Sequence, residues 1–233
     1  MVKPDEHRVA RNAIVITLSF TVFLWLILFI EWAGNFDFTG LGIYPRTLHG
    51  TIGILTAPLI HGGIFHLLSN TLPLILLGIG LFYFYHRIAL EVFIWIYLTT
   101  GFWVWIIGRS AYHIGASGII YGLMSFILIS GMIRRNVRSL AVSMAVFVLY
   151  SGMIYGIFPV EPHVSWESHL MGLLTGVVLA VFFRKEPIYV GETDGEALEE
   201  EDEPGNDIPR FSEPESDSEK NINVIYKFKP KKK

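Results

Sequence analysis

Long stretches without Asp, Glu, Lys or Arg occupy most of the first 186 residues of the chain. A helix that crosses about 30 Å of hydrocarbon needs about 20 mostly apolar residues, and runs of about 17 or more qualify. The last run is long enough if Trp166 and Arg184 lie at the two interfaces. The uncharged runs cover residues 12–30, 47–85, 92–108, 110–133, 139–160 and 168–183.

The run over residues 47–85 is too long for a single membrane-spanning helix. Gly50, Gly53 and Pro58 interrupt its first part, which we interpret as a re-entrant or interfacial segment leading into a helix over about 66–85. The pattern therefore predicts an all-α membrane protein built as a bundle of six transmembrane helices. It divides the chain into an N-terminal segment (1–11), a membrane domain (12–186) and a tail (187–233).

The basic residues between the predicted spans set the orientation. Lys and Arg collect in cytoplasmic loops, so the side with more of them is expected to be cytoplasmic. An N-terminus inside the cell gives nine basic residues inside and two outside, with both termini cytoplasmic and a long first outer loop. A cleaved signal peptide is not expected, because no small-residue cleavage site follows the first apolar run. The inner residues are Lys3, Arg8, Arg11, Arg87, Arg134, Arg135, Arg138, Arg184 and Lys185, and the outer ones are Arg46 and Arg109.

Composition agrees with this membrane assignment and separates the tail from the rest. The chain is 52% hydrophobic and 17% charged, has no cysteine and has a mean hydropathy of +0.48. Disulfides and thiol catalysis are thereby excluded. The tail holds 13 of the 21 acidic residues and 7 of the 18 basic ones. We expect it to be a disordered acidic cytoplasmic tail with a basic end, because it has too few apolar residues to fold alone.

Three polar residues share one predicted depth in the membrane. The next basic residue on the inner side follows after 17 residues for Asn70, 17 for Ser117 and 15 for His169. At a rise of 1.5 Å per residue, all three lie roughly 22 to 26 Å above the inner surface. Polar side chains at this depth are costly and usually face a bundle interior or a hydrated cavity. These residues are therefore candidates for a common site.

Small residues accompany two members of this layer. The sequence G-I-I-Y-G over 118–122 follows Ser117, and G-L-L-T-G over 172–176 follows His169. Both are small-xxx-small patterns that allow two helix backbones to approach closely. Close approach would let the short Ser117 side chain reach the His169 imidazole. Gly118 and Gly172 are therefore predicted to support the site.

A serine beside a histidine suits acyl transfer. The Ser117 hydroxyl needs a base that removes its proton, and a neutral His169 imidazole fits that role. No Asp or Glu lies between residues 92 and 160, and Glu167 is expected on another face of its helix from His169. We therefore predict a dyad. His66 and Asn70, four residues apart on one helix face, are candidate oxyanion donors together with the Ser117 backbone N–H.

Each of these residues also has a structural interpretation on its own. Ser117 alone could serve helix packing, and Asn70 or His169 alone could make an interhelical polar contact. A metal site is disfavoured, because His61 and His66 are five residues apart, about 140° around a helix, and the sequence has no HExxH motif. A transporter is disfavoured by the absence of detectable inverted repeats.

Three motifs together resemble the signature of the rhomboid family of intramembrane serine proteases. They are H-G-G-I-F-H-L-L-S-N over 61–70, G-A-S-G over 115–118 and H-L-M-G over 169–172. The resemblance covers about residues 12–184. Arg46 resembles the Arg of the family's first loop, but Tyr44 and Pro45 precede it where many members have a Trp.

The resemblance implies a function and a role for each site residue. It implies an endopeptidase that cleaves single-pass membrane proteins in or near their transmembrane segments, without a metal, ATP or other cofactor and without a nucleic-acid partner. It also implies a place in a lipid bilayer, as a multi-pass protein of a bacterial inner membrane. A non-catalytic rhomboid-like protein that binds transmembrane helices is the alternative. The implied roles are nucleophile for Ser117, general base for His169, oxyanion donors for His66 and Asn70, and a ring stacked on the base for Tyr121.

Overall fold

The computed structural model describes residues 5–149 and 153–189. The predicted tail beyond residue 189 and residues 1–4 of the predicted N-terminal segment lie outside the described residues. The longer helices are α1 (Glu6–Gly34), α3 (Ile64–Phe84), α4 (Ala89–Ile107), α5 (Ser117–Arg134), α6 (Val137–Leu149) and α8 (Trp166–Phe182). The short helices are α2 (Gly53–Thr56) and α7 (Met153–Gly156), with 3-10 turns at Thr39–Leu41, His49–Thr51 and Ala57–Leu59.

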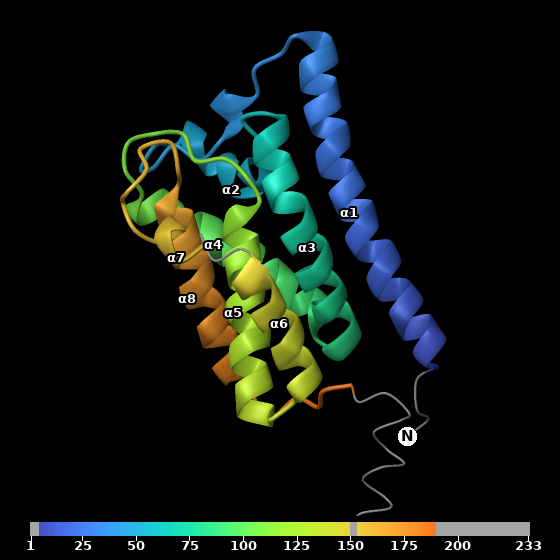
Figure 1. The fold of residues 1–233 in the computed structure, drawn as a ribbon. Helices are drawn as coiled ribbons and strands as arrows, with labels where there is room; N and C mark the ends of the chain where they lie inside the picture. The colour runs from blue at the N-terminus through green and yellow to red at the C-terminus, as the bar shows by residue number, and fades with distance from the viewer. Residues whose placement is uncertain (1–4, 150–152, 190–233) are drawn as a thin grey trace, which may run out of the picture. The chain divides into compact units, whose positions relative to one another are not determined.

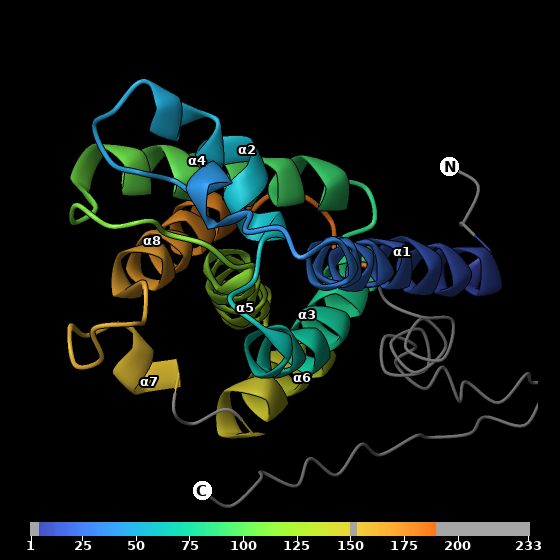
Figure 2. The ribbon, with the colours of Figure 1, turned by 90° about the horizontal axis from the view of Figure 1, so that it is seen from above.

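Helix α5 lies at the centre of the bundle. Seen along the bundle, α3, α4, α6 and α8 surround it, and α1 lies outside α3 (Figure 2). About 67% of the apolar window of α5 is buried, against 28% for α1 and α4. The helix that begins at Ser117 is therefore the one most shielded from the surroundings.

Four of the described helices are long and apolar enough to cross a membrane, namely α1, α3, α4 and α5. Helices α6 and α8 are apolar but shorter. In the described part of the chain, the extended pairing amounts to one isolated bridge between Ile43 and His113. The prediction of an all-helical membrane bundle is confirmed at this level.

Helix α5 is shorter than its uncharged run. The run covers 110–133, yet α5 begins only at Ser117. Gly115 has a φ of +107°, a left-handed conformation that helices do not contain, and the backbone of His113 pairs with Ile43. The run over 139–160 overlaps α6 (Val137–Leu149) and the short α7 (Met153–Gly156), on either side of residues 150–152, which lie outside the described part of the chain.

The loop between α1 and α3 forms a folded layer at one end of the bundle (Figure 1). Arg46 Nη1 donates to the carbonyls of Ile106 (3.2 Å) and Gly108 (2.8 Å) at the end of α4. Trp105 Nε1 donates to the Thr47 carbonyl at 2.9 Å. These bonds attach the loop to α4. The segment predicted to be re-entrant or interfacial consists of 3-10 turns and the short helix α2.

Candidate active site

Ser117 is the first residue of α5, and the loop before it is fixed by the folded layer. The Gly115 N–H donates to the Ala57 carbonyl at 2.8 Å, and the Ala116 N–H donates to Nε2 of His61 at 3.3 Å. The first N–H groups of a helix have no acceptor within it. The Ser117 backbone N–H and hydroxyl are thus held at a rigid helix start.

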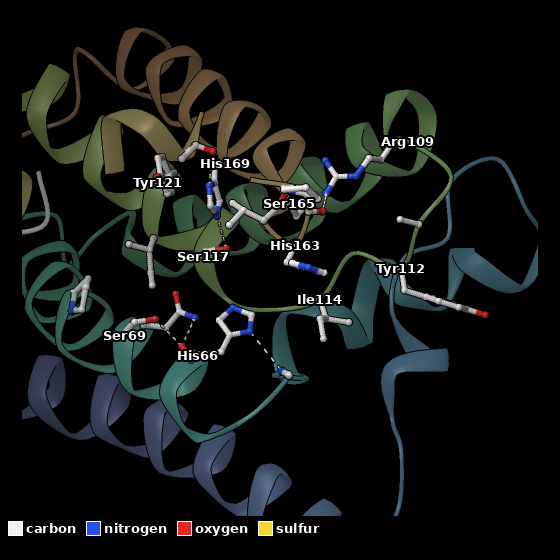
Figure 3. Close-up of a pocket in the computed structure, with 18 residues that line it drawn as sticks. His66, Ser69, Arg109, Tyr112, Ile114, Ser117, Tyr121, His163, Ser165 and His169 are labelled. Atoms are coloured by element: carbon white, nitrogen blue, oxygen red, sulfur yellow. Dashed lines mark hydrogen bonds between the residues drawn. The ribbon is translucent and has the colours of Figure 1, made fainter. Parts of the chain in front are cut away.

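His169 lies on the first turn of α8 and contacts Ser117 directly (Figure 3). Its Nε2 is 2.7 Å from Oγ of Ser117, and its Nδ1 is 2.7 Å from the carbonyl oxygen of Gly156. A carbonyl oxygen can only accept, so Nδ1 must carry the hydrogen. In the neutral ring Nε2 is then the unprotonated nitrogen, and it accepts a hydrogen bond from the Ser117 hydroxyl.

Two further features hold the His169 ring in place. The Tyr121 ring stacks on it with centroids 4.2 Å apart and an interplanar angle of 9°. A Cβ on Gly156 would overlap the Tyr121 hydroxyl and would lie 2.9 Å from Nδ1 of His169. The Gly156 carbonyl can therefore reach the imidazole because this residue has no side chain.

The close approach expected from the two glycine pairs is present between α5 and α8. A Cβ on Gly172 would overlap the Gly118 carbonyl oxygen, and one on Gly176 would overlap the Gly122 carbonyl oxygen. The two backbones touch along this seam, which we call the glycine seam. The seam brings Ser117 and His169, from different helices, within one hydrogen bond.

His66 and Asn70 lie on α3, across the cavity from His169. The Gly62 N–H donates to Nδ1 of His66 at 3.4 Å, which leaves the hydrogen of a neutral ring on Nε2. A Cβ built on Gly115 would lie 2.8 Å from that Nε2 and 4.0 Å from Oγ of Ser117. Asn70 Nδ2 donates to the His66 carbonyl at 3.0 Å. Nε2 of His66 therefore lies near Ser117, and Asn70 lines the same cavity.

A cavity of about 820 Å³ connects these groups. Its wall combines polar side chains with apolar ones such as Pro73, Ile114 and Ile120. A space of this size holds water or an extended piece of polypeptide. The polar wall includes His66, Asn70, Ser117, Tyr121, His169 and, at the rim, Arg109.

Sequence reasoning missed two partners of the site. The Gly156 carbonyl could not be found from side-chain motifs, because the bonding atom belongs to the backbone. Arg109 was counted only as an outer charge, yet it pairs with Glu167 at 3.2 Å. Glu167, the carboxylate two residues before His169, was expected on another face of the helix; it accepts hydrogen bonds from Arg109, and Nδ1 of His113 lies 4.0 Å from its Oε2. The signal available in the sequence was Glu167, an acidic residue two positions before the candidate base His169.

The helices and this geometry define an integral membrane protein in which a partly buried serine and a buried histidine are hydrogen bonded. The family model described as the Rhomboid domain matches residues 49–186. This match covers more than half of the chain, and the chain belongs to the rhomboid family.

Relatives from bacteria and a plant agree with this assignment. An uncharacterized protein of Mycobacterium tuberculosis is 33% identical over 176 residues, covering 70% of this chain and 72% of the relative. An uncharacterized protein of Mycobacterium leprae is 33% identical over 212 residues, covering 84% and 78%. The RHOMBOID-like protein 1 of Arabidopsis thaliana is 30% identical over 149 residues, covering 60% and 36%.

Proposed function

We propose that the chain is an intramembrane serine endopeptidase that hydrolyses peptide bonds in or near the transmembrane segments of other membrane proteins. The observation that carries this proposal is the 2.7 Å contact between Nε2 of His169 and Oγ of Ser117. The Gly156 carbonyl supports it, because it selects the tautomer in which His169 can act as a base.

The proposed reaction has two halves. In the first, Oγ of Ser117 attacks the scissile carbonyl while Nε2 of His169 takes the hydroxyl proton. His169 then gives that proton to the leaving amine, which leaves an acyl-enzyme on Ser117. In the second half, His169 removes a proton from a water molecule that attacks the acyl group and frees Ser117.

The tetrahedral intermediates of both halves need donors for the oxyanion. The Nε2–H of His66, the Asn70 amide and the Ser117 backbone N–H are the proposed donors. Asn70 uses one amide hydrogen on the His66 carbonyl, so its second hydrogen is available for a substrate oxygen. Removing one such donor typically slows an acyl-transfer enzyme by about 10²- to 10³-fold.

The membrane arrangement is part of the proposal. Helices α6 and α8 act as the fifth and sixth spans, and both termini face the cytoplasm. At 1.5 Å per residue, the 17 residues of α8 extend about 26 Å, so His169 in its first turn lies beneath the outer rim. The cavity then opens to the extracytoplasmic side of a bacterial inner membrane, from which water enters.

A non-catalytic membrane protein that binds transmembrane helices is the alternative, because the family match does not by itself include catalysis. Labelling of the purified protein by a fluorophosphonate probe in detergent separates the two. We expect wild type to be labelled, Ser117→Ala to be unlabelled and Ser69→Ala, which alters another serine of the cavity wall, to be labelled normally. A folded wild type that stays unlabelled would refute the protease.

A further inference from the structure

Arg109 connects three segments that meet at the outer rim of the cavity. Its Nη1 pairs with Oε2 of Glu167, on the first turn of α8, at 3.2 Å. Its backbone N–H donates to Oε1 of the same carboxylate at 3.2 Å. Its Nη2 donates to the carbonyls of Pro162 and Val164, each at 2.8 Å. One side chain thus joins the loop before Ser117, the loop over 157–165 and α8.

The ion pair between Arg109 and Glu167 is important because one of its members is buried. The Glu167 side chain is only 2% exposed, whereas the Arg109 side chain is 36% exposed. A buried carboxylate without a charged partner is strongly unfavourable, so Glu167 holds Arg109 in place. A planar guanidinium can bond a carboxylate and two carbonyls in fixed directions, which a lysine ammonium cannot reproduce.

His113 ties the same loops together a second time. Its Nδ1 is 2.6 Å from the Ser165 hydroxyl, and its Nε2 is 3.1 Å from the Arg109 carbonyl. Burial lowers the pKa of His113, so the ring is neutral near pH 7 and its Nε2–H donates to that carbonyl. His113 is itself fixed by the backbone bridge to Ile43.

We propose that Arg109 and Glu167 are positioning residues that hold the 157–165 loop over the cavity and hold the first turn of α8 where His169 meets Ser117. We call Arg109, Glu167 and the two carbonyls they fasten the outer latch. Neither side chain reaches the reacting atoms, since the bonds of Glu167 go to Arg109 and those of Arg109 to Glu167 and the loop. The catalytic part of this inference rests on the proposed protease function.

The position of the latch explains why it acts on the dyad. Glu167 is two residues before His169 on the same helical turn, and Arg109 begins the segment that ends at Ser117. Figure 3 shows Arg109 directed toward the segment that carries Ser165, on the far side of His169 from Tyr121. Loosening the latch releases the outer end of α8, while the glycine seam still holds the helix farther down.

Hydrogen–deuterium exchange and enzyme kinetics on full-length variants in detergent test the latch. The variants are Arg109→Lys, Glu167→Gln and the double variant, which keep side-chain volume close to wild type. The controls are Arg184→Lys, whose guanidinium bonds the Val181 carbonyl near the other end of α8, and Glu161→Gln, an exposed acid in the same loop. Thermal unfolding verifies that each variant is folded.

We expect each single variant to increase amide exchange in the 157–165 loop and the first turn of α8 by about tenfold or more, as local opening becomes easier. The rate of fluorophosphonate labelling and kcat should fall together by about tenfold, with KM for a membrane substrate within about twofold of wild type. The double variant should be no slower than either single variant, because both remove the same interaction. The controls should match wild type.

Two outcomes overturn the inference. Unchanged exchange in the loop and α8 refutes the latch, whatever happens to activity. Faster exchange with unchanged labelling and kcat refutes the positioning role. The exchange measurement requires no catalysis, so a wild type that is never labelled refutes the protease alone, and loop exchange still decides whether the latch exists.

Discussion

The two sides of the cavity are held by different kinds of contact. On the α8 side, His169 is fixed by Ser117 of α5, the ring of Tyr121 and the carbonyl of Gly156, all from other segments of the chain. On the α3 side, the hydrogen bonds of the His66 and Asn70 side chains are local, since each joins residues four apart in the sequence.

Exposure follows the same division. Helix α5 is buried along most of its length, whereas α3 carries Phe65 at 86% exposure and Leu68 at 53% beside the two polar residues. The contacts on the α8 side therefore hold Ser117 and His169 in one arrangement. On the α3 side, the hydrogen bonds that position His66 and Asn70 come from residues close to them in the sequence. Substitutions on the two sides should accordingly differ in kind.

The largest effect is expected from His169→Ala. Under the proposed mechanism the nucleophile loses its base, and kcat should fall by about a thousandfold or more. The fold should persist, because the glycine seam is untouched. Cleavage of a model transmembrane substrate in proteoliposomes measures the rate, and near-normal turnover would contradict the assignment of the base.

The second-largest effect is expected from Gly172→Ala, because the added methyl group would push the backbones of α5 and α8 apart. The added Cβ would overlap the Gly118 carbonyl oxygen, which should lower the free energy of unfolding by about 1–3 kcal/mol and reduce probe labelling. Gly80→Ala on α3 is the matched control, since its Cβ would lie 3.3 Å from a Val142 methyl group that can move. Equal melting temperatures for the two variants would show that the seam is not tight.

Asn70→Ala tests the α3 side. If Asn70 is an oxyanion donor, kcat should fall by about 10²-fold, while Ser117 remains reactive toward the probe because the dyad is intact. Ser69→Ala is the control, since its hydroxyl donates to the same His66 carbonyl at 2.8 Å. A cleavage rate like that of wild type would remove Asn70 from the oxyanion site.

The smallest effect is expected at Tyr121. Tyr121→Leu removes the stacked ring, and a stacking energy of about 0.5–1.5 kcal/mol corresponds to a loss of about two- to tenfold in kcat. Tyr121→Phe keeps the ring and should retain most of the rate. Steady-state kinetics on the pair separates stacking from the hydroxyl, and a larger loss for Phe than for Leu would exclude stacking as the reason.

The fold could be predicted to the extent that it follows from hydrophobic length and small residues. The hydrophobic pattern located α3, α4 and α8 within a few residues, and the glycine pairs at 118–122 and 172–176 indicated which two helices touch. The start of α5 at Ser117 could not be read from hydropathy, because residues 110–116 are uncharged yet form a loop. That boundary depends on Gly115 and on the pairing of His113 with Ile43, a contact across 70 residues.

The candidate site was predictable where side chains carry it and unpredictable where the backbone does. Ser117, His169, His66 and Asn70, all singled out from the sequence, lie around one cavity. The Gly156 carbonyl and the loop carbonyls bonded by Arg109 have no signature in a sequence, since every residue has a carbonyl. Their positions are determined only once the loops have folded.

The uncharged character of the Gly156 carbonyl has an electrical consequence. A carboxylate in its place would keep a permanent anion at membrane depth, whereas here His169, Ser117 and their partner are all neutral at rest. Under the proposed mechanism a cation on the ring and an anion on the substrate oxygen arise in the same step and disappear in the same step. A low-dielectric environment penalises a lone ion. At the dyad itself, charge is therefore present only briefly and as a pair of opposite signs.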